Sequence, residues 1–278
     1  MSETGEMSER SETGEGDAVE RSDEPVTVER LESDLRELGL SAGDTVLVHA
    51  SLSALGWVPG GAPAVVDALM GVVAATGTLA MPAHSSQLSD PTHWENPPVP
   101  DDWVETIKEA SPPFRPELTP TRGIGAIADC FRDYPGVRRS AHPVSSFAAW
   151  GADAEFVVEN HAYDSSLGEE SPLARLFDLD ARVLRLGVDA NTSLHLAEYR
   201  AEYDGKSYEQ NGGPVLENGE RRWVTYEEPE SEDDFREVEA AFEDDYSVRR
   251  GRVGEADATL LSQRELVEFG TRWMSENR

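Results

Sequence analysis

Short apolar runs alternate along this chain with segments of helical periodicity, and this alternation constrains the fold most. Residues 28–40 carry leucines at helical spacing, and the apolar run TVLVHA follows at 45–50. A second helical segment at 64–75 leads to a second apolar run at 77–83. Helical spacing predicts amphipathic helices, and short bounded apolar runs predict buried strands. The order therefore predicts a β-α-β unit in an α/β protein.

The same alternation continues to the end of the chain. Residues 171–180 predict a helix, 181–188 a strand and 191–203 a further helix. We therefore expect a central β-sheet flanked by helices. A closing helix should pack through the apolar residues of one face, which are Leu266, Phe269, Trp273 and Met274.

Two segments depart from this alternation. The segment 84–120 is rich in prolines and polar residues, so we expect an irregular excursion over the surface. The segment 209–255 carries Asn218 and Gly219 between two candidate strands. Because Asn-Gly favours the turn of a β-hairpin, this segment predicts a small β excursion from the main sheet.

The chain divides into a tail and one folded domain. Residues 1–25 contain almost no bulky apolar group, so they predict a disordered acidic tail whose removal leaves the rest unchanged. Residues 26–278 predict a single domain. The tail lacks the basic and apolar regions of a secretory signal, and no run reaches the roughly 18 apolar residues that cross a bilayer. We expect a soluble, cytoplasmic protein.

The charge of the chain excludes some partners. The formal charge is −31, with 55 acidic and 24 basic residues, of which only Lys108 and Lys206 are lysines. So negative a field repels phosphate backbones, which argues against a nucleic-acid partner. We interpret the excess acid as adaptation to high salt, a halophilic trait, with attraction of polycationic substrates as the alternative. The single cysteine, Cys130, cannot form an internal disulfide.

A first candidate site is the loop HASLSALGWVPGG at 49–61, which follows a strand and precedes a helix. Such a loop exposes hydroxyls and backbone N–H groups to a phosphate. It fits neither the ATP-binding pattern GxxxxGK[ST] nor the dinucleotide pattern GxGxxG. A plain tight turn is the alternative.

A second candidate lies within 118–151. Some of its arginines could hold a phosphate through two parallel hydrogen bonds, or they could simply neutralise neighbouring carboxylates. For His142, before a proline, a structural hydrogen-bonded role is the default. Its residues of interest are Thr121, Arg122, Gly123, Arg138, Arg139 and His142.

The third candidate is the pair His195 and Glu198 on a predicted helix. Residues three apart share a helix face, and a carboxylate beside an imidazole raises the basicity that a general base needs. A surface ion pair is the alternative.

Together these stretches resemble the aminoglycoside 3-N-acetyltransferase family, from about Leu35 to the C-terminus. The matching motifs are HASLSALGWVPGG, GTLAMPAHS, TRGIGAIADCFRDYPGVRRSAHPVSSFAAWG, GEESPLARLF and LGVDANTSLHLAEYRAEY. The resemblance implies an α/β sandwich, acetyl-CoA as co-substrate, and acetylation of the 3-amino group of a 2-deoxystreptamine aminoglycoside. It also implies a small-molecule amine as partner, and a homodimer is possible. We expect no metal, and the charge and the absence of long apolar runs argue against a nucleic-acid or membrane partner.

The resemblance also implies roles for residues. His195 would be the general base, and Glu198 would orient it. Acetyl-CoA would lie against the serine and glycine loop and a short segment beside it, which together supply Ser51, Ser53, Gly56, Val58, Gly60, Thr121, Arg122 and Gly123.

Three alternatives stay open. The acceptor could be an amine other than an aminoglycoside, because a fold does not fix a substrate. A zinc hydrolase could use His49, His84, His142 and His195, although the spacing matches no zinc motif. A non-enzymatic protein could keep the fold without binding acetyl-CoA.

Overall fold

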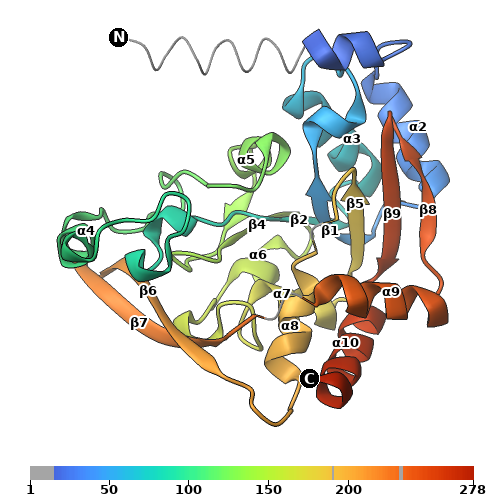
Figure 1. Ribbon diagram of the computed structural model, residues 1–278. Coiled ribbons are helices and arrows are strands. Elements are labelled where there is room, and N and C mark those ends of the chain that lie inside the picture. The colour runs from blue at the N-terminus through green and yellow to red at the C-terminus, as the bar shows by residue number, and fades with distance from the viewer. Residues whose placement is uncertain (1–15, 190, 232–233) are drawn as a thin grey trace.

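The computed structural model describes residues 16–189, 191–231 and 234–278. Its main sheet has seven strands in the order β3-β4-β2-β1-β5-β9-β8. β1 pairs parallel with β2 and β5, and the outer strands pair antiparallel (Figure 1). The strands of this sheet are β1 (Thr45–Ala50), β2 (Thr78–Pro82), β3 (Arg138–Arg139), β4 (Phe147–Gly151), β5 (Arg182–Leu186), β8 (Arg249–Val253) and β9 (Ala256–Ser262).

Helices cover both faces of the sheet (Figure 1). Side chains of a strand point alternately to its two faces. Accordingly, Val46 and Val48 of β1 join one buried core, and Leu47 joins the other. The helices of the first core are α2 (Val28–Leu38), α3 (Ala62–Val73) and α5 (Ala126–Arg132). Those of the second are α6 (Ala154–Val158), α7 (Pro172–Asp178), α8 (Ser193–Arg200), α9 (Phe235–Asp245) and α10 (Gln263–Asn277). The expected α/β fold is confirmed.

The ends of α2 show how local sequence sets an element. The hydroxyl of Thr27 accepts a hydrogen bond from the backbone N–H of Arg30, which caps the N-terminus. Gly39 ends the helix with φ 107°, a left-handed conformation that favours glycine.

The apolar face of α10 packs as expected. In this helix, Leu266 and Met274 are fully buried, and Phe269 and Trp273 pack partly buried against the same core.

The expected hairpin is present but shorter than the segment assigned to it. β6 (Tyr208–Glu217) and β7 (Glu220–Pro229) form a separate two-stranded sheet. Asn218 and Gly219 both have positive φ, 53° and 83°, as a tight hairpin turn requires. The rest of 209–255 does not belong to this excursion, because α9 packs into the second core and β8 pairs with β9 of the main sheet.

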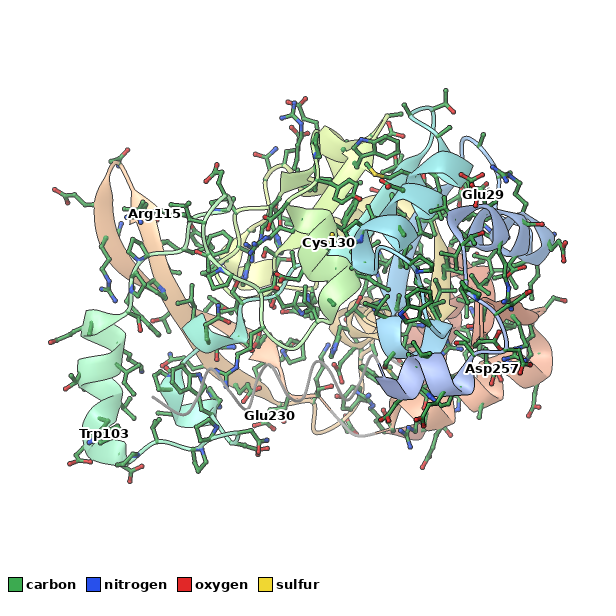
Figure 2. The ribbon with its side chains drawn as sticks, turned by 90° about the horizontal axis from the view of Figure 1, so that it is seen from above. Glu29, Trp103, Arg115, Cys130, Glu230 and Asp257 are labelled. Carbon is green, nitrogen blue, oxygen red and sulfur yellow. The ribbon has the colours of Figure 1, made fainter. Side chains whose placement is uncertain are left out.

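The proline-rich segment 84–120 is largely irregular, with the short helix α4 (Val104–Ala110) near its middle. It lies against the hairpin: the N–H of Phe114 donates to the carbonyl of Pro214, and Arg221 donates to the carbonyl of Ser111. In Figure 2, Trp103 and Arg115 lie at the opposite end of the molecule from Glu29.

The segment expected to be a disordered tail is partly ordered. Residues 1–15 lie outside the described residues, but 16–21 form a helix. Ala18 is buried, and the hydroxyl of Ser22 accepts a hydrogen bond from the N–H of Trp57 at 2.8 Å. For residues 16–25 the expectation of disorder is therefore wrong, because this stretch packs on the 49–61 loop.

Removing residues 1–25 should consequently lower the melting temperature, because the contacts of Ala18 and Ser22 are lost. Each kcal/mol lost lowers the Tm of a domain of this size by about 2–4 °C. Thermal unfolding measures the change, with removal of residues 1–15 alone as the control. Equal melting temperatures for both truncations would show that residues 16–25 contribute nothing.

No helix among the described residues combines the length and the apolar character needed to span a bilayer.

Candidate active site

A cavity of about 1000 Å³ opens at the edge of the sheet where the parallel strands β1 and β2 end. The loop after β1 leads to α3 on one face of the sheet, and the loop after β5 leads to α8 on the other. Connections that leave toward opposite faces open a crevice between them, a common place for ligands in α/β proteins. The wall combines residues of the N-terminal helix, these loops and the start of α5, namely Ala18, Val48–Ser53, Gly56–Val58, Gly60, Gly61, Met81, Pro82, His84, Gly123–Ala128, Val188 and Thr192.

The serine and glycine loop forms one side of this cavity. All five residues expected in it lie in the wall: Ser51, Ser53, Gly56, Val58 and Gly60. The hydroxyls of Ser51 and Ser53 are 3.0 Å apart. Gly56 has φ 86° and ψ −163°, a conformation that is essentially restricted to glycine. The loop therefore presents backbone groups and hydroxyls to the cavity.

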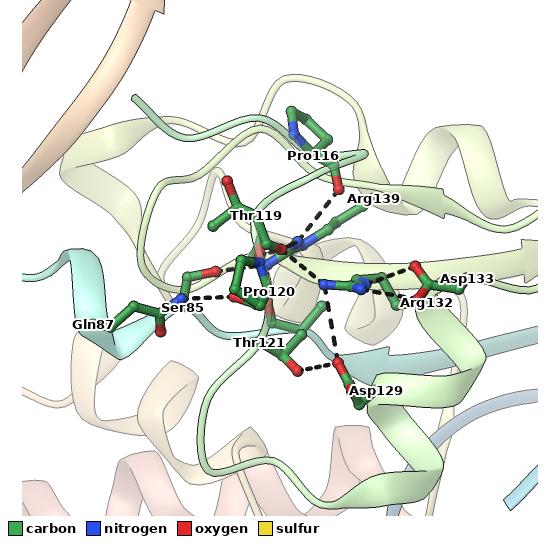
Figure 3. A network of polar contacts seen from close by, with 12 residues as sticks. Ser85, Gln87, Pro116, Thr119, Pro120, Thr121, Asp129, Arg132, Asp133 and Arg139 are labelled. Carbon is green, nitrogen blue, oxygen red and sulfur yellow. Dashed lines mark hydrogen bonds and ion pairs between the residues drawn. The ribbon is translucent and has the colours of Figure 1, made fainter. Parts of the chain in front are cut away.

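The second expected segment contributes one of its three residues. Gly123 lies in the wall, whereas Thr121 and Arg122 do not. The hydroxyl of Thr121 donates to Asp129 at 2.5 Å, and the guanidinium of Arg122 donates to the carbonyl of Asn96 at 3.0 Å. Both side chains are thus engaged in contacts within the protein (Thr121 in Figure 3).

Arg132 and Arg139 form hydrogen bonds that join neighbouring segments of the backbone. Arg139 donates to the carbonyl of Thr119 at 2.6 Å and to the hydroxyl of Ser85 at 2.6 Å (Figure 3). It also donates to the carbonyl of Ala83 at 2.5 Å. Burial, and secondarily the nearby Arg132, lower the pKa of Arg139 to about 10. Arg132 also donates to Thr119. These bonds fix the segment before α5 onto the end of β2.

His142 is a structural histidine in the fold. Its Nδ1 accepts from the N–H groups of Val144 and Ser145, so its Nε2–H donates to the carbonyl of Tyr163 at 3.2 Å. Burial, together with the neighbouring His161, keeps the pKa of His142 well below its usual value. His142 is therefore neutral and fully used by the fold.

The pair His195 and Glu198 lies on α8, as expected. The Nδ1 of His195 is 3.3 Å from Oε2 of Glu198, and the imidazole packs edge-on against Phe235. The Glu198 side chain is 2% exposed and that of His195 is 31% exposed. Burial alone would raise the pKa of Glu198, but hydrogen bonds from His195 and Arg278 outweigh it and lower the pKa. The carboxylate therefore stays ionised beside the imidazole.

The cavity wall contains two further histidines, His49 at the end of β1 and His84 just beyond β2. Burial, with a smaller effect of Arg185, lowers the pKa of His49 to about 4. Burial lowers the pKa of His84 to about 3, and the charge of a protonated His195 contributes. His195 is not in the wall itself, but it lies within electrostatic range of His84, which is. Both wall histidines are neutral near pH 7.

Sequence reasoning placed His49 and His84 in two of the family motifs but gave them no individual role except as zinc ligands, and missed their position in this cavity. The available signal was that His49 lies at the end of one parallel strand and His84 just beyond the next, and such strand ends meet at one edge of a sheet. Within the described ranges, no three His, Cys, Asp or Glu side chains are grouped to hold a metal ion.

A buried carboxylate fixes an imidazole here, next to a cavity lined by a glycine loop, hydroxyls and neutral histidines. Such a site can hold a long phosphate-bearing ligand and accept a proton from a bound group. Fold and site define a group-transfer enzyme of the α/β class.

Comparison with known proteins identifies the class more closely. The family model for aminoglycoside 3-N-acetyltransferase matches residues 47–275. The aminoglycoside N(3')-acetyltransferase-like protein YokD of Bacillus subtilis is 44% identical over 93% of this chain and 96% of its own length. Aminoglycoside N(3)-acetyltransferase VII of Streptomyces paromomycinus is 37% identical over 93% of this chain and 94% of its own. The chain belongs to the aminoglycoside 3-N-acetyltransferase family.

Solved structures agree with this assignment. The crystal structure of YokD matches with a TM-score of 0.91 and 44% identity over 94% of this chain and 97% of that one. AAC-VIa bound to sisomicin matches at 0.83 and 32% identity over 92% of this chain and 99% of that one. AAC-IIIb with CoASH matches at 0.80 and 31% identity over 91% and 97% of the two chains. The expected family, fold and class of acetyl-CoA-dependent enzyme are confirmed.

Proposed function

We propose that this enzyme transfers the acetyl group of acetyl-CoA to the 3-amino group of a 2-deoxystreptamine aminoglycoside, with His195 as general base. The observation that carries the proposal is the buried, ionised Glu198 held against Nδ1 of His195 near the cavity. Sisomicin bound to one relative and CoASH bound to another support the acceptor and the donor.

The cavity suits acetyl-CoA. The pyrophosphate of this ligand needs hydrogen-bond donors, and the 49–61 loop offers hydroxyls of Ser51 and Ser53 together with backbone N–H groups. No lysine or arginine of the described part of the chain lines the cavity, but the guanidinium of Arg21 donates to the carbonyl of Ser53 at 3.2 Å. One cation therefore lies on the loop that would face the phosphates.

The roles of the protein groups follow from the orientation of the dyad. Because Nδ1–H donates to Glu198, the lone pair of the neutral imidazole is on Nε2. The acceptor nitrogen forms a C–N bond with the thioester carbonyl carbon as the C–S bond breaks. Nε2 takes the proton of the amine, and the CoA thiolate leaves. Glu198 stabilises the imidazolium that develops.

A thiol-release assay with acetyl-CoA and a panel of aminoglycosides and other amines tests the proposal. Turnover with sisomicin would support the aminoglycoside as acceptor. YokD is named only as acetyltransferase-like, so an amine of another class is the second candidate. Turnover confined to such amines would support the assignment as an acetyltransferase but would overturn the proposal that the acceptor is an aminoglycoside. The halophilic interpretation of the acidic composition stays a prediction.

Acetyl-CoA should also raise the melting temperature. A ligand bound only by the native state stabilises it by RT ln(1 + [L]/Kd), which is about 2.7 kcal/mol at a hundred times Kd. Differential scanning fluorimetry measures the shift, with ATP and NAD as control ligands because the loop matches neither of their motifs. An equal shift from either would indicate general anion binding.

A further inference from the structure

Arg278 connects the end of α10 to the candidate catalytic dyad. Its Nη1 donates to Oε1 of Glu198 at 2.8 Å, and the other oxygen of this carboxylate faces His195. On its far side, the guanidinium forms a two-bond pair with Asp234, with distances of 2.8 and 2.6 Å. Figure 1 shows the C-terminus beside α8. One guanidinium thus links three elements, α8, α9 and α10.

The surroundings make this contact a strong one. The side chain of Arg278 is 6% exposed and that of Glu198 is 2% exposed, so little water screens their charges. Hydrogen bonds to Asp234, Tyr203 and Glu198 outweigh burial and raise the pKa of Arg278. It therefore carries its charge at every working pH.

We propose that Arg278 is a positioning residue of the acetyl-transfer reaction, which fixes the Glu198 carboxylate so that its other oxygen, Oε2, holds His195 in the tautomer a base requires. This inference rests on the proposed function, because it assumes that His195 is the base. The guanidinium occupies Oε1 and so leaves Oε2 for Nδ1 of His195. Its positive charge also keeps the carboxylate ionised without a proton from the imidazole.

Charged and titratable groups from several elements surround the pair of His195 and Glu198 and influence its titration. Glu198 is on α8, and Lys206 lies just beyond that helix. The ammonium of Lys206 donates to the carbonyls of Glu198, Tyr199 and Ala201 at the end of α8. α9 contributes Phe235 and is preceded by Asp234. His84 approaches from the end of β2 and is neutral near pH 7. Arg278 hydrogen-bonds the carboxylate of the dyad directly.

The charge of Arg278 predicts the direction in which a substitution shifts the protonation midpoint, the pH at which the pair of His195 and Glu198 has taken up half of its proton. Replacing Arg278 with glutamine removes a buried positive charge, so the pair of His195 and Glu198 should take up its proton at higher pH. Glu198→Gln should move the midpoint in the opposite direction, because it removes the negative charge. We expect Arg278→Gln to lower kcat about tenfold, less than loss of the base itself.

Nuclear magnetic resonance titration of the full chain, labelled with ¹³C in histidine, reads this midpoint directly. The His195 signal is assigned by its absence in His195→Ala. Arg264→Gln is the matched control, because Arg264 lies at the other end of α10, about 21 Å away along a helix of 1.5 Å rise per residue. It pairs with Asp180 and should leave the midpoint unchanged.

The outcomes separate this inference from the proposed function. An unchanged or lower midpoint in a folded Arg278→Gln protein would overturn the positioning role, whatever the turnover shows. Full turnover by His195→Ala would instead overturn the assignment of His195 as the general base. If the glutamine variant does not fold, Arg278→Lys decides: it keeps the charge, so the midpoint should stay while kcat falls severalfold, and an unchanged kcat would refute the role.

Discussion

Replacing His195 with alanine should lower kcat by on the order of a hundredfold or more, while the affinity for acetyl-CoA stays nearly the same. A general base contributes about 10²–10⁴-fold because it acts in the transition state, and His195 is not among the residues that line the cavity proposed for acetyl-CoA. Thiol release measures kcat, and calorimetric titration measures the binding of acetyl-CoA.

The matched control is His93→Ala. His93 also faces a glutamate at 3.3 Å, Glu209, but both side chains of that pair are more than a third exposed and lie on the surface. A His–Glu pair without a catalytic role should therefore tolerate the change. Near-normal turnover by His195→Ala would show that another group serves as base.

The pH dependence of kcat/KM should also test the role of His195 as the base. Only the neutral imidazole accepts a proton, so kcat/KM should fall at low pH as His195 is protonated. The ionised Glu198 favours the imidazolium, so Glu198→Gln should move this acidic limb to lower pH and also reduce the maximal rate. Comparing both proteins with one acceptor cancels the ionisation of the acceptor amine.

The second large effect is expected at Gly125, which precedes α5 in the cavity wall. Its φ of 85° and ψ of 158° are essentially restricted to glycine, and a Cβ would lie 3.4 Å from the carbonyl oxygen of Ala50. Strain of about 1–3 kcal/mol in this region corresponds to about a 5- to 150-fold change in an equilibrium. Gly125→Ala should therefore weaken acetyl-CoA binding by about fivefold or more, measured by calorimetric titration.

Gly43→Ala is the control for Gly125→Ala. Gly43 also has a positive φ, 92°, and no atom lies within 4 Å of the added Cβ, but the residue is in the turn before β1, away from the cavity wall. It should cost stability without changing the affinity. Equal affinities for wild type and Gly125→Ala would mean that the loop before α5 does not contact the cofactor.

Much of the fold could be predicted from periodicity. The apolar runs became β1, β2 and β5, and Asn218-Gly219 formed the expected turn. The length of the hairpin excursion could not be predicted, because the residues of β8 are largely exposed and carry no strand pattern of their own. Their place is set by pairing with β9, a contact that only the folded chain makes.

The candidate site was predictable where its residues are close in sequence. His195 and Glu198 are three apart on one helix, so spacing sufficed. Arg278 is 80 positions from Glu198, and only packing of α10 beside α8 brings them together. Thr121 and Arg122 had the right residue types, but partners at Asp129 and Asn96 turn their side chains elsewhere.

The tip of the separate hairpin, at Asn218 and Gly219, can change length without disturbing the pairing of the main sheet. Among the described residues, β6 and β7 form a ladder with each other and with no strand of the seven-stranded sheet, so the register of that sheet is independent of the hairpin's length. Insertions or deletions at the Asn218 turn would leave every ladder of that sheet intact. We expect natural variation among relatives to accumulate at this tip, while the segments around β1, β2 and β5 tolerate few changes. The architecture is in this sense well suited to diversify without losing its fold.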